Sequence, residues 1–281
     1  MKIITDIKAM QKKADELRAI GKKIGFVPTM GFLHEGHLNL IREAKKRCDT
    51  TIMSIYVNPT QFGPDEDLDD YPRDFDRDCS LAEKEGCDII FHPDSKQIYP
   101  DNYLTYVEVE DITSVLCGAS RPGHFKGVTT IVTKLFNIVK PHVAVFGQKD
   151  AQQAIVIKKM TRDLNLDIDI VVAPIVREKD GLAKSSRNTY LSGDEREQAL
   201  VLNQSLKMAE KEIKSGERNA EKLKSAIVDL ITRQPDAVID YVEIVEADTL
   251  APVTIITNEV LIAFAVKIGR TRLIDNIVVQ V

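Results

Sequence analysis

The sequence predicts an α/β protein in which a doubly wound, mostly parallel sheet is followed by a second, smaller α+β C-terminal domain. Up to about residue 176, short β-rich apolar runs alternate with amphipathic helical segments. Strands joined through helices form right-handed crossovers between parallel neighbours. After about Arg187 the pattern changes to two helices followed by three strand-like runs. A chain of 281 residues is long enough for both domains.

The elements of the N-terminal domain follow from capping and periodicity. Asp6 can cap a helix that runs to about Ile20. The helix itself is predicted because Met10 and Ala14 recur on one face of it. The other expected elements are, in order, strand 23–27, helix 36–48, strand 51–57, a long loop 58–73, helix 74–86, strand 88–91, strand 107–109, a short helix 112–116, helix 127–139, strand 143–146, helix 150–163 and strand 168–172.

The C-terminal elements are two charged amphipathic helices and then three strands. They are expected at 194–214, 219–233, 238–245, 259–267 and 272–279. The boundary falls between Val176 and Leu191, so we expect domains of residues 1–180 and 181–281.

Composition and charge exclude several classes of function. A net charge of −5 argues against broad binding to nucleic acid or to an acidic membrane surface. No apolar run approaches the roughly 20 residues of a membrane span, and the N-terminal residues show no signal-peptide apolar region. The four cysteines form no Cys-x-x-Cys pair, which predicts reduced thiols in a cytoplasmic protein.

Residues 28–37 read Pro-Thr-Met-Gly-Phe-Leu-His-Glu-Gly-His, between an apolar strand and an amphipathic helix. The start of a helix exposes unpaired N–H groups and partial positive charge, so it favours phosphate. Gly31 and Gly36 let a ligand approach the backbone, and His34 and His37 add donors of adjustable charge. We therefore predict a nucleotide site here, at the carboxyl edge of the sheet. If either imidazole must be charged to bind phosphate, affinity falls as pH rises through the imidazole range.

Two other interpretations of these histidines are weaker. The zinc helix motif needs histidines at i and i+4, whereas His34 and His37 are three apart. The other histidines (His92, His124 and His142) are dispersed, and no second Cys/His cluster follows. The plainer alternative, a surface helix start with solvated imidazoles, does not explain the position directly after a strand.

Polar side chains also follow the strand expected at 51–57. Asn58 and Gln61 stand at the same carboxyl edge, so they are candidates for hydrogen bonds to a substrate. An ordinary turn after a strand is the alternative for this segment. Further along, Arg121 or Lys126 could bind an anion, with a solvated basic turn as the alternative.

A second strand–glycine–helix sequence occurs at residues 146–153. Lys149 can reach phosphate, Asp150 could help to hold Mg²⁺, and Gln153 could hydrogen-bond a substrate. Gln152 is better explained as part of a polar helix face. In residues 181–188, two cations flank two hydroxyls, which suits a polyphosphate, although an interdomain linker is the alternative.

Together these segments resemble the pantoate–β-alanine ligase (pantothenate synthetase) family, within the His-x-Gly-His group of nucleotidyltransferase-like enzymes. The matching motifs, in order, are Pro28-Thr29-Met30-Gly31 with His34-Glu35-Gly36-His37, Asn58-Pro59 with Gln61-Phe62-Gly63, Gly123-His124-Phe125, Gly147-Gln148-Lys149-Asp150 with Gln152-Gln153, and Ser185-Ser186-Arg187-Asn188. The resemblance covers nearly the whole chain and implies a Rossmann-like nucleotide- and pantoate-binding domain, with the C-terminal domain closing over the site.

The resemblance also implies roles for individual residues. The ATP-binding residues would be Met30, Gly31, Phe32, Leu33, His34, Glu35, Gly36, His37, Gly147, Gln148, Lys149, Asp150, Val176, Lys184, Ser185, Ser186 and Arg187. Gln61 and Gln153 would hold pantoate, and His37 would be the proton donor. His34, His37, Lys149, Ser186 and Arg187, with Mg²⁺, would offset charge on the phosphates. Lys126 and Lys184 depart from the residues that many members carry.

The activity implied is the ATP-dependent ligation of pantoate and β-alanine through a pantoyl-adenylate, in a cytoplasmic homodimer. Such chemistry depends on positioning and charge stabilisation, which fits the lack of any nucleophile constellation in the sequence. Two alternatives stay open. One is a nucleotidyltransferase that acts on a phosphorylated acceptor, and the other is a nucleotide-binding module without turnover.

Overall fold

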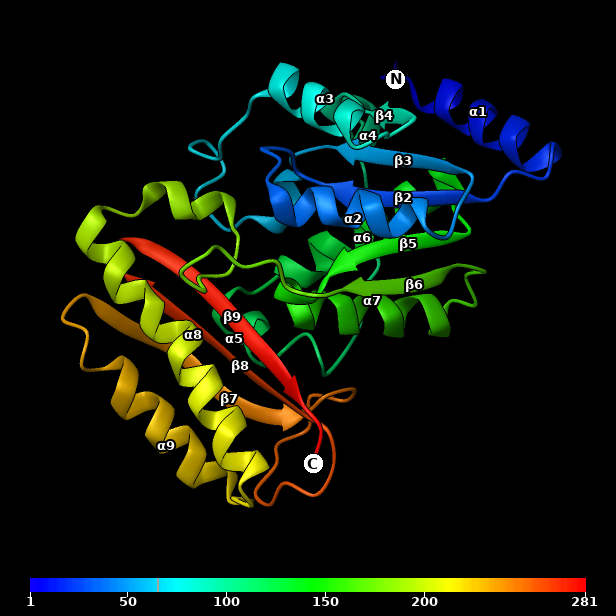
Figure 1. The fold of residues 1–281 in the computed structure, drawn as a ribbon. Coiled ribbons are helices and arrows are strands. Elements are labelled where there is room, and N and C mark those ends of the chain that lie inside the picture. Colours follow the sequence, from blue (N-terminus) through cyan, green and yellow to red (C-terminus); the bar gives the residue numbers. More distant parts are fainter. Residues whose placement is uncertain (65) are drawn as a thin grey trace. The chain divides into compact units, whose positions relative to one another are not determined.

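The structure is a computed structural model that describes residues 1–64 and 66–281 (Figure 1). The chain divides into two compact units, each made of several segments. The first unit is Met1–Glu110, Arg121–Gly147 and Val156–Pro174, and the second is Asp111–Ser120, Gln148–Ile155 and Ile175–Val281.

The first unit contains a parallel sheet and the helices that connect its strands. Its elements are β1 (Lys2–Ile4), α1 (Ile7–Ala19), β2 (Ile24–Thr29), α2 (Glu35–Lys45), β3 (Thr50–Ile55), the 3₁₀ turn η1 (Pro59–Gln61), α3 (Phe75–Lys84), β4 (Ile89–Phe91), α4 (Ser95–Ile98), α6 (His124–Val139), β5 (Val143–Gly147) and β6 (Asp169–Ala173). Helix α7 (Ala151–Asp163) begins in the second unit and ends in the first.

The six described strands of this sheet are ordered β1-β4-β3-β2-β5-β6, and every pairing is parallel. The chain leaves β2 for β3 on one side and later returns to β5 on the other side. The carboxyl ends of β2 and β5 therefore form a topological switch point, where doubly wound sheets bind ligands.

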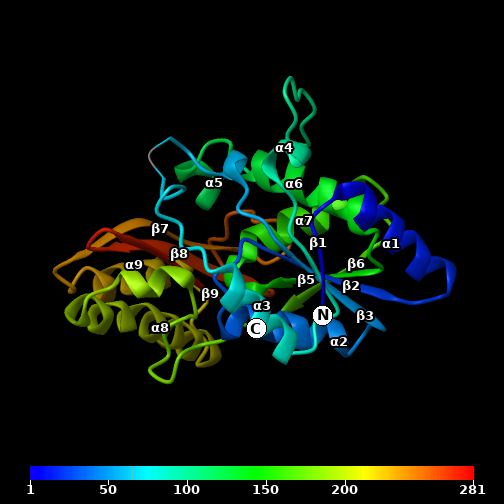
Figure 2. The same ribbon diagram turned by 90° about the horizontal axis from the view of Figure 1, so that it is seen from above.

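Alternate residues of the strands pack against helices on opposite faces of the sheet. Val27 and Met53 pack with Leu38 and Ile41 of α2, in a buried apolar cluster. On the other face, Phe26 makes an edge-to-face contact with Phe136 of α6, with ring centroids 6.5 Å apart. Helices α2 and α3 accordingly cover one face, and α1 and α6 the other (Figure 2).

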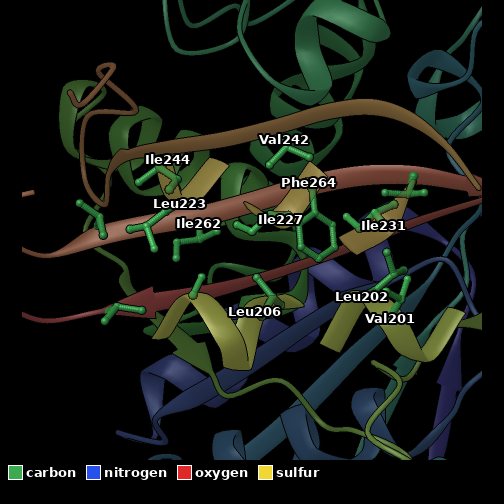
Figure 3. Packing of buried hydrophobic residues seen from close by; sticks show 14 of the residues in the cluster. Val201, Leu202, Leu206, Leu223, Ile227, Ile231, Val242, Ile244, Ile262 and Phe264 are labelled. Carbon is green, nitrogen blue, oxygen red and sulfur yellow. The ribbon is translucent and has the colours of Figure 1, made fainter. Parts of the chain in front are cut away.

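The second unit combines short turns with two helices and an antiparallel sheet. Its elements are α5 (Cys117–Ser120), η2 (Gln148–Asp150), η3 (Ser186–Tyr190), α8 (Gly193–Lys214), α9 (Ala220–Ile231), β7 (Ala237–Glu246), β8 (Val260–Ile268) and β9 (Thr271–Val279). The described strands pair in the order β7-β8-β9. The core residues labelled in Figure 3 are Val201, Leu202, Leu206, Leu223, Ile227, Ile231, Val242, Ile244, Ile262 and Phe264, all buried. Helices α8 and α9 thus pack on one face of this sheet.

The predicted fold class is confirmed: a doubly wound parallel sheet and a smaller α+β unit with its own core. Two predicted elements are wrong. Residues 107–109 form no strand, because Val107 donates its N–H to Thr130 Oγ1 and accepts from Thr129 Oγ1 instead of pairing with a strand. Residues 112–116 are turns, and the short helix begins at Cys117.

Some short elements were not predicted. Among them are β1, α4 and η1, which lies inside the loop expected at 58–73. Each spans three or four residues, which is too short for hydrophobic periodicity to register. Among the described residues, no helix combines the length and apolar character that crossing a membrane requires.

Candidate active site

The turn between β2 and α2 is held by a buried carboxylate from another helix. Asp78 of α3 accepts the backbone N–H groups of Phe32 and Leu33, each at 2.7 Å. Gly31 has φ +88°, and a Cβ there would lie 2.9 Å from Asp78 Oδ2, so glycine is required on both counts. The Phe32 backbone is also left-handed, with φ +50°. Asp78 therefore fixes a strained turn at the end of the central strand.

Burial of Asp78 makes the charged form of its carboxylate unfavourable. Its side chain is 1% exposed, and Arg77 Nη1 lies 3.6 Å from Oδ1 with the Arg77 side chain 45% exposed. Burial raises the pKa of Asp78, although the two N–H donors and Arg77 oppose the shift. No sequence motif singled out Asp78. The available signal was a charged residue on the apolar side of a helix, one turn before the buried Ala82.

Both imidazoles of the His-x-Gly-His motif cap helix α2. His34 is the N-cap residue, and its Nδ1 accepts the N–H of Gly36 at 3.1 Å. The His37 Nδ1 accepts the N–H of His34 at 3.3 Å, which closes a capping box. The two rings stack with centroids 4.1 Å apart. The two rings are thus stacked on each other and hydrogen-bonded to the same turn.

The capping hydrogen bonds favour the same neutral tautomer in both rings. Because each Nδ1 accepts an N–H, the neutral tautomer with its proton on Nε2 is the one that fits. A charged ring would place an Nδ1–H opposite a backbone N–H and lose the capping bond. The two Nε2–H groups of His34 and His37 can donate to an anion without the ring being charged.

The remaining residues of this turn have defined contacts. Met30 Sδ accepts from Gln61 Nε2 at 3.1 Å, so the turn is joined to the segment after β3. Glu35, in the first turn of α2, forms an ion pair with Arg42. Gly147 ends β5, the neighbour of β2 in the sheet. The structure therefore brings the first predicted cluster together at the switch point with Gln61.

Asn58 and Gln61 contact each other. Asn58 is 1% exposed, and its Nδ2 donates to Gln61 Oε1 at 3.1 Å and to the Gly127 carbonyl at 3.2 Å. Its Oδ1 accepts from Tyr99 Oη at 2.9 Å. A Cβ on Gly127 would lie 2.3 Å from the Thr60 carbonyl oxygen, so α6 packs directly on η1. Asn58 is thus part of the support under Gln61.

The basic turn before α6 has internal partners. Arg121 forms an ion pair with Glu66 and donates to the Gln61 carbonyl at 3.3 Å. Burial raises the pKa of Glu66, but Arg121 outweighs it and the net pKa is lowered. Lys126 Nζ lies 3.2 Å from Glu108 Oε2. In this structure, Arg121 supports the turn that carries Gln61.

The predicted residues after β5 belong to the second unit. Lys149 and Asp150 lie in η2, with Lys149 Nζ 3.6 Å from Asp150 Oδ1. The sequence pattern placed Gln152 on a polar helix face, and this prediction is wrong. Gln152 is buried, and its Nε2 donates to the Ile112 and Val115 carbonyls at 2.9 and 2.7 Å. Gln153 is half-buried in the first turn of α7.

The segment that carries Lys184 and Arg187 is held in its conformation by hydrogen bonds within the segment. Lys184 N donates to the Val176 carbonyl at 2.9 Å, and Lys184 Nζ lies 3.4 Å from Glu178 Oε2. Ser185 caps η3 by accepting the Arg187 N–H at 3.3 Å, and Ser186 is the buried first residue of η3. The cations and hydroxyls of this segment are therefore on an ordered turn.

Metal ligands are sparse in the part of the chain that the structure describes. Residues 1–64 and 66–281 contain no group of three or more His, Cys, Asp or Glu side chains that could hold an ion. Mg²⁺ is commonly bound through one or two carboxylates plus substrate phosphates and water. Asp150, whose side chain is 47% exposed, fits that pattern as a single ligand.

Comparison with known proteins decides the family. The model of the family "Pantoate-beta-alanine ligase" matches residues 2–278. The chain belongs to the pantoate–β-alanine ligase family. The resemblance found in the sequence motifs is thereby confirmed, and with it the assignment of the chain to a family of ligases.

Relatives in this family match along their whole length. A protein of Acetivibrio thermocellus named pantothenate synthetase is 60% identical over 99% of this chain and 98% of its own. One of Caldicellulosiruptor saccharolyticus with the same name is 59% identical over 100% of both chains.

Solved structures of family members share the fold. The pantothenate synthetase of Thermus thermophilus superposes with a TM-score of 0.93 at 38% identity, covering 99% of both chains. The pantoate–β-alanine ligase of Francisella tularensis gives 0.80 at 36% identity, covering 99% of this chain and 97% of that one. That structure is described as a complex with "Beta-gamma ATP" and β-alanine.

Proposed function

We propose that this protein joins (R)-pantoate to β-alanine in two steps driven by ATP. In the first, a pantoate carboxylate oxygen attacks the α-phosphorus, the bond from that phosphorus to the β-phosphate bridging oxygen breaks, and pyrophosphate leaves. In the second, the β-alanine nitrogen attacks the carbonyl carbon of the pantoyl-adenylate, AMP leaves with the bonding electrons, and the nitrogen loses a proton. The products are pantothenate, AMP and pyrophosphate. Membership of the ligase family supports this reaction.

The observation that carries the proposal is the pair of stacked, capped imidazoles at the switch point. Their two Nε2–H groups lie at the positive end of the α2 dipole, which favours phosphate oxygens as acceptors. The residues predicted to bind ATP in the first unit run from Met30 to His37, with Gly147. Those in the second unit are Gln148, Lys149, Asp150, Val176, Lys184, Ser185, Ser186 and Arg187.

Mg²⁺ belongs to the same proposal. Asp150 would hold it together with nucleotide oxygens, and the ion would neutralise phosphate charge. Lys149, Ser186 and Arg187 would stabilise the charge that develops on the leaving pyrophosphate. Sequestration from water matters as well, because hydrolysis of the adenylate would waste ATP.

Pantoate would be held by Gln61 and Gln153. The Gln61 amide is oriented by Asn58 on its oxygen and by Met30 on its nitrogen, so the side chain is pre-organised. We propose that Asn58, predicted as a direct substrate contact, acts by orienting Gln61. Gln61 would also lie near β-alanine.

The test is exchange of labelled pyrophosphate into ATP. Wild-type protein should catalyse exchange only when pantoate is present and without any amine. Exchange without pantoate, or dependence on a phosphorylated acceptor, would favour a different nucleotidyltransferase. Nucleotide binding with no exchange would favour a binding module.

The same substitution at two different histidines, His37 and His142, gives this assay a test variant and a matched control. His37→Asn keeps an acceptor for the capping bond but lacks the ring donor, and should slow exchange by roughly a hundredfold. His142 precedes β5, at the edge of the sheet opposite to the carboxyl ends, and its Nδ1 accepts from Ile24 N at 2.9 Å. His142→Asn should leave exchange unchanged within about twofold.

We also propose that residues 1–180 and 181–281 act as two domains, and that the second closes over the bound nucleotide. One apolar core lies within residues 1–180 and another within residues 181–281, which supports movement of the two domains as rigid bodies. ATP with pantoate should protect residues 180–190 from proteolysis. Equal cleavage with and without these ligands would contradict closure.

Assembly as a homodimer in the cytoplasm completes the proposal. Leu104 and Tyr106 of the first unit are 86% and 49% exposed, which suits burial against a second copy. Sedimentation equilibrium should give twice the chain mass, and a Leu104→Asp variant should weaken the association. The four cysteines are all free thiols, which supports a reducing compartment.

A further inference from the structure

Strand β9 carries two adjacent buried polar residues in an otherwise apolar stretch. Asp275 and Asn276 are 2% and 3% exposed. Burial of polar groups is tolerated only when they are paired, so their partners reveal what they do. Asp275 stands opposite Phe264 and Asn276 opposite Ala263 in the antiparallel register, so the two side chains leave the strand on opposite faces.

Asp275 holds the base of the segment that carries Lys184 to Arg187. Its carboxylate accepts a bidentate fork from Arg177, with Nη1 at 2.6 Å from Oδ2 and Nη2 at 2.9 Å from Oδ1. Arg177 Nη1 also donates to the Gly181 carbonyl at 3.1 Å. The backbones of Arg177 and Ala183 form an isolated antiparallel β-bridge. Arg177 is therefore an anchor for both strands of a small hairpin that ends one residue before Lys184.

Asn276 holds the turn that carries Lys149 and Asp150. Its Nδ2 donates to the Gln148 and Lys149 carbonyls at 3.0 and 2.9 Å, and its Oδ1 accepts from Gln148 Nε2 at 3.0 Å. Both amide hydrogens and the amide oxygen are thus engaged by η2. The Asn276 N–H in turn donates to Asp275 Oδ1 at 2.8 Å, which couples the two residues.

From these contacts we propose that Asp275 and Asn276 are positioning residues that fix Lys149 relative to Lys184, Ser186 and Arg187. One rigid strand would then set the spacing of both groups that bind the departing pyrophosphate. The inference rests on the proposed function and concerns only the first half-reaction. A misplacement of about 1 Å can cost a hundredfold in rate.

The experiment separates the two half-reactions in Asp275→Asn and Asn276→Ser. Pantoate-dependent pyrophosphate exchange should lose about 10- to 100-fold in kcat, with the KM for pantoate changed by less than about threefold. Single-turnover attack of β-alanine on added pantoyl-adenylate should stay within about twofold of wild type, because no pyrophosphate leaves in that step. An equal fall in both half-reactions would show a merely structural role and overturn the proposal.

Asp240→Asn is the matched control. Asp240 pairs with Arg272 of β9 at 2.7 Å, so the chemical change is the same and β9 is again the partner, but neither predicted ATP segment is involved. Its exchange rate should equal that of wild type. If Asp275→Asn does not fold, Asn276→Ser decides the question, because it removes no charge.

A double variant tests the route through Lys149. If Asn276 acts through that ammonium, Lys149→Ala with Asn276→Ser should exchange no more slowly than Lys149→Ala alone, within about twofold. If the rate losses of the two single variants multiply in the double variant, Asn276 does not act through Lys149. Absence of exchange in the wild type would reject the proposed function itself, whereas wild-type exchange with undiminished variants would reject only this inference.

Discussion

Two buried aspartates, one in each unit, hold segments predicted to bind ATP, and they do so with different partners. Asp78 accepts two backbone N–H groups of the turn after β2. Asp275 accepts a bidentate fork from the Arg177 guanidinium as well as one backbone N–H. The first carboxylate is stabilised mainly by dipoles and the second by a full charge. Removal of a partner should therefore be more damaging at Asp275.

The largest effect should follow loss of the Arg177 charge. Arg177→Met leaves Asp275 buried without its cation, which should lower the free energy of unfolding by about 3–5 kcal/mol. The double variant Arg177→Met with Asp275→Leu should recover most of this loss, because no buried charge remains. Urea denaturation measures both. A double variant no more stable than Arg177→Met would contradict the comparison.

A smaller loss is expected when Asp78 is replaced. Asp78→Asn keeps one acceptor and places an amide N–H₂ against a backbone donor, so one buried N–H loses its partner, at a cost of about 1–3 kcal/mol. The turn should also loosen, which would raise the KM for ATP. Asp76→Asn, in the same helix and exposed, is the control and should change stability by less than about 0.5 kcal/mol. Equal losses in the two variants would refute the role of Asp78.

The pH dependence of stability provides a separate test of the buried state of Asp78. Burial raises the folded-state pKa of Asp78, so its contribution is fully present below the unfolded value of about 3.9 and is lost as pH rises through the folded value. The free energy of unfolding of wild type minus that of Asp78→Asn should therefore fall as pH rises from about 4, by about 1.4 kcal/mol per unit of pKa shift, and then level off. A constant or rising difference would contradict this. Urea titrations at a series of pH values provide the measurement.

The smallest effect on the free energy of unfolding should come from the N-cap of helix α2. His34→Ala removes the N-cap acceptor and should cost about 0.5–2 kcal/mol, whereas His34→Asn restores a good cap. Both lack the Nε2–H donor, so both should lose pyrophosphate exchange to a similar extent. Recovery of activity in His34→Asn would show that capping, and not the imidazole donor, is what the reaction needs. Thermal unfolding and the exchange assay together separate the two roles.

Much of the candidate site was accessible from the sequence because it lies in contiguous motifs next to strand ends. The strand, glycine turn and helix around residues 28–37 follow from local rules, and α2 begins at Glu35 as the capping histidine requires. Gln61 and Lys149 were found in the same way. Their roles in catalysis remain predictions.

The residues that support the site were missed because their partners are far away in the chain. Asp78 is 46 residues from Phe32, and Asn276 is 127 residues from Lys149. Gln152 was misassigned for the same reason, since its acceptors lie 37 and 40 residues upstream. The absent strand at 107–109 also depended on distant groups, the hydroxyls of Thr129 and Thr130.

The sequence by itself determined the order of strands and helices, the glycine turns and the chemical character of the phosphate-binding segments, because these depend on local backbone preferences and on hydrophobic periodicity. Only the tertiary structure decided which buried polar groups hold those segments in place. A carboxylate or amide reveals its function through the atoms that satisfy it after burial, and for Asp78, Asp275 and Asn276 the important ones belong to other segments of the chain.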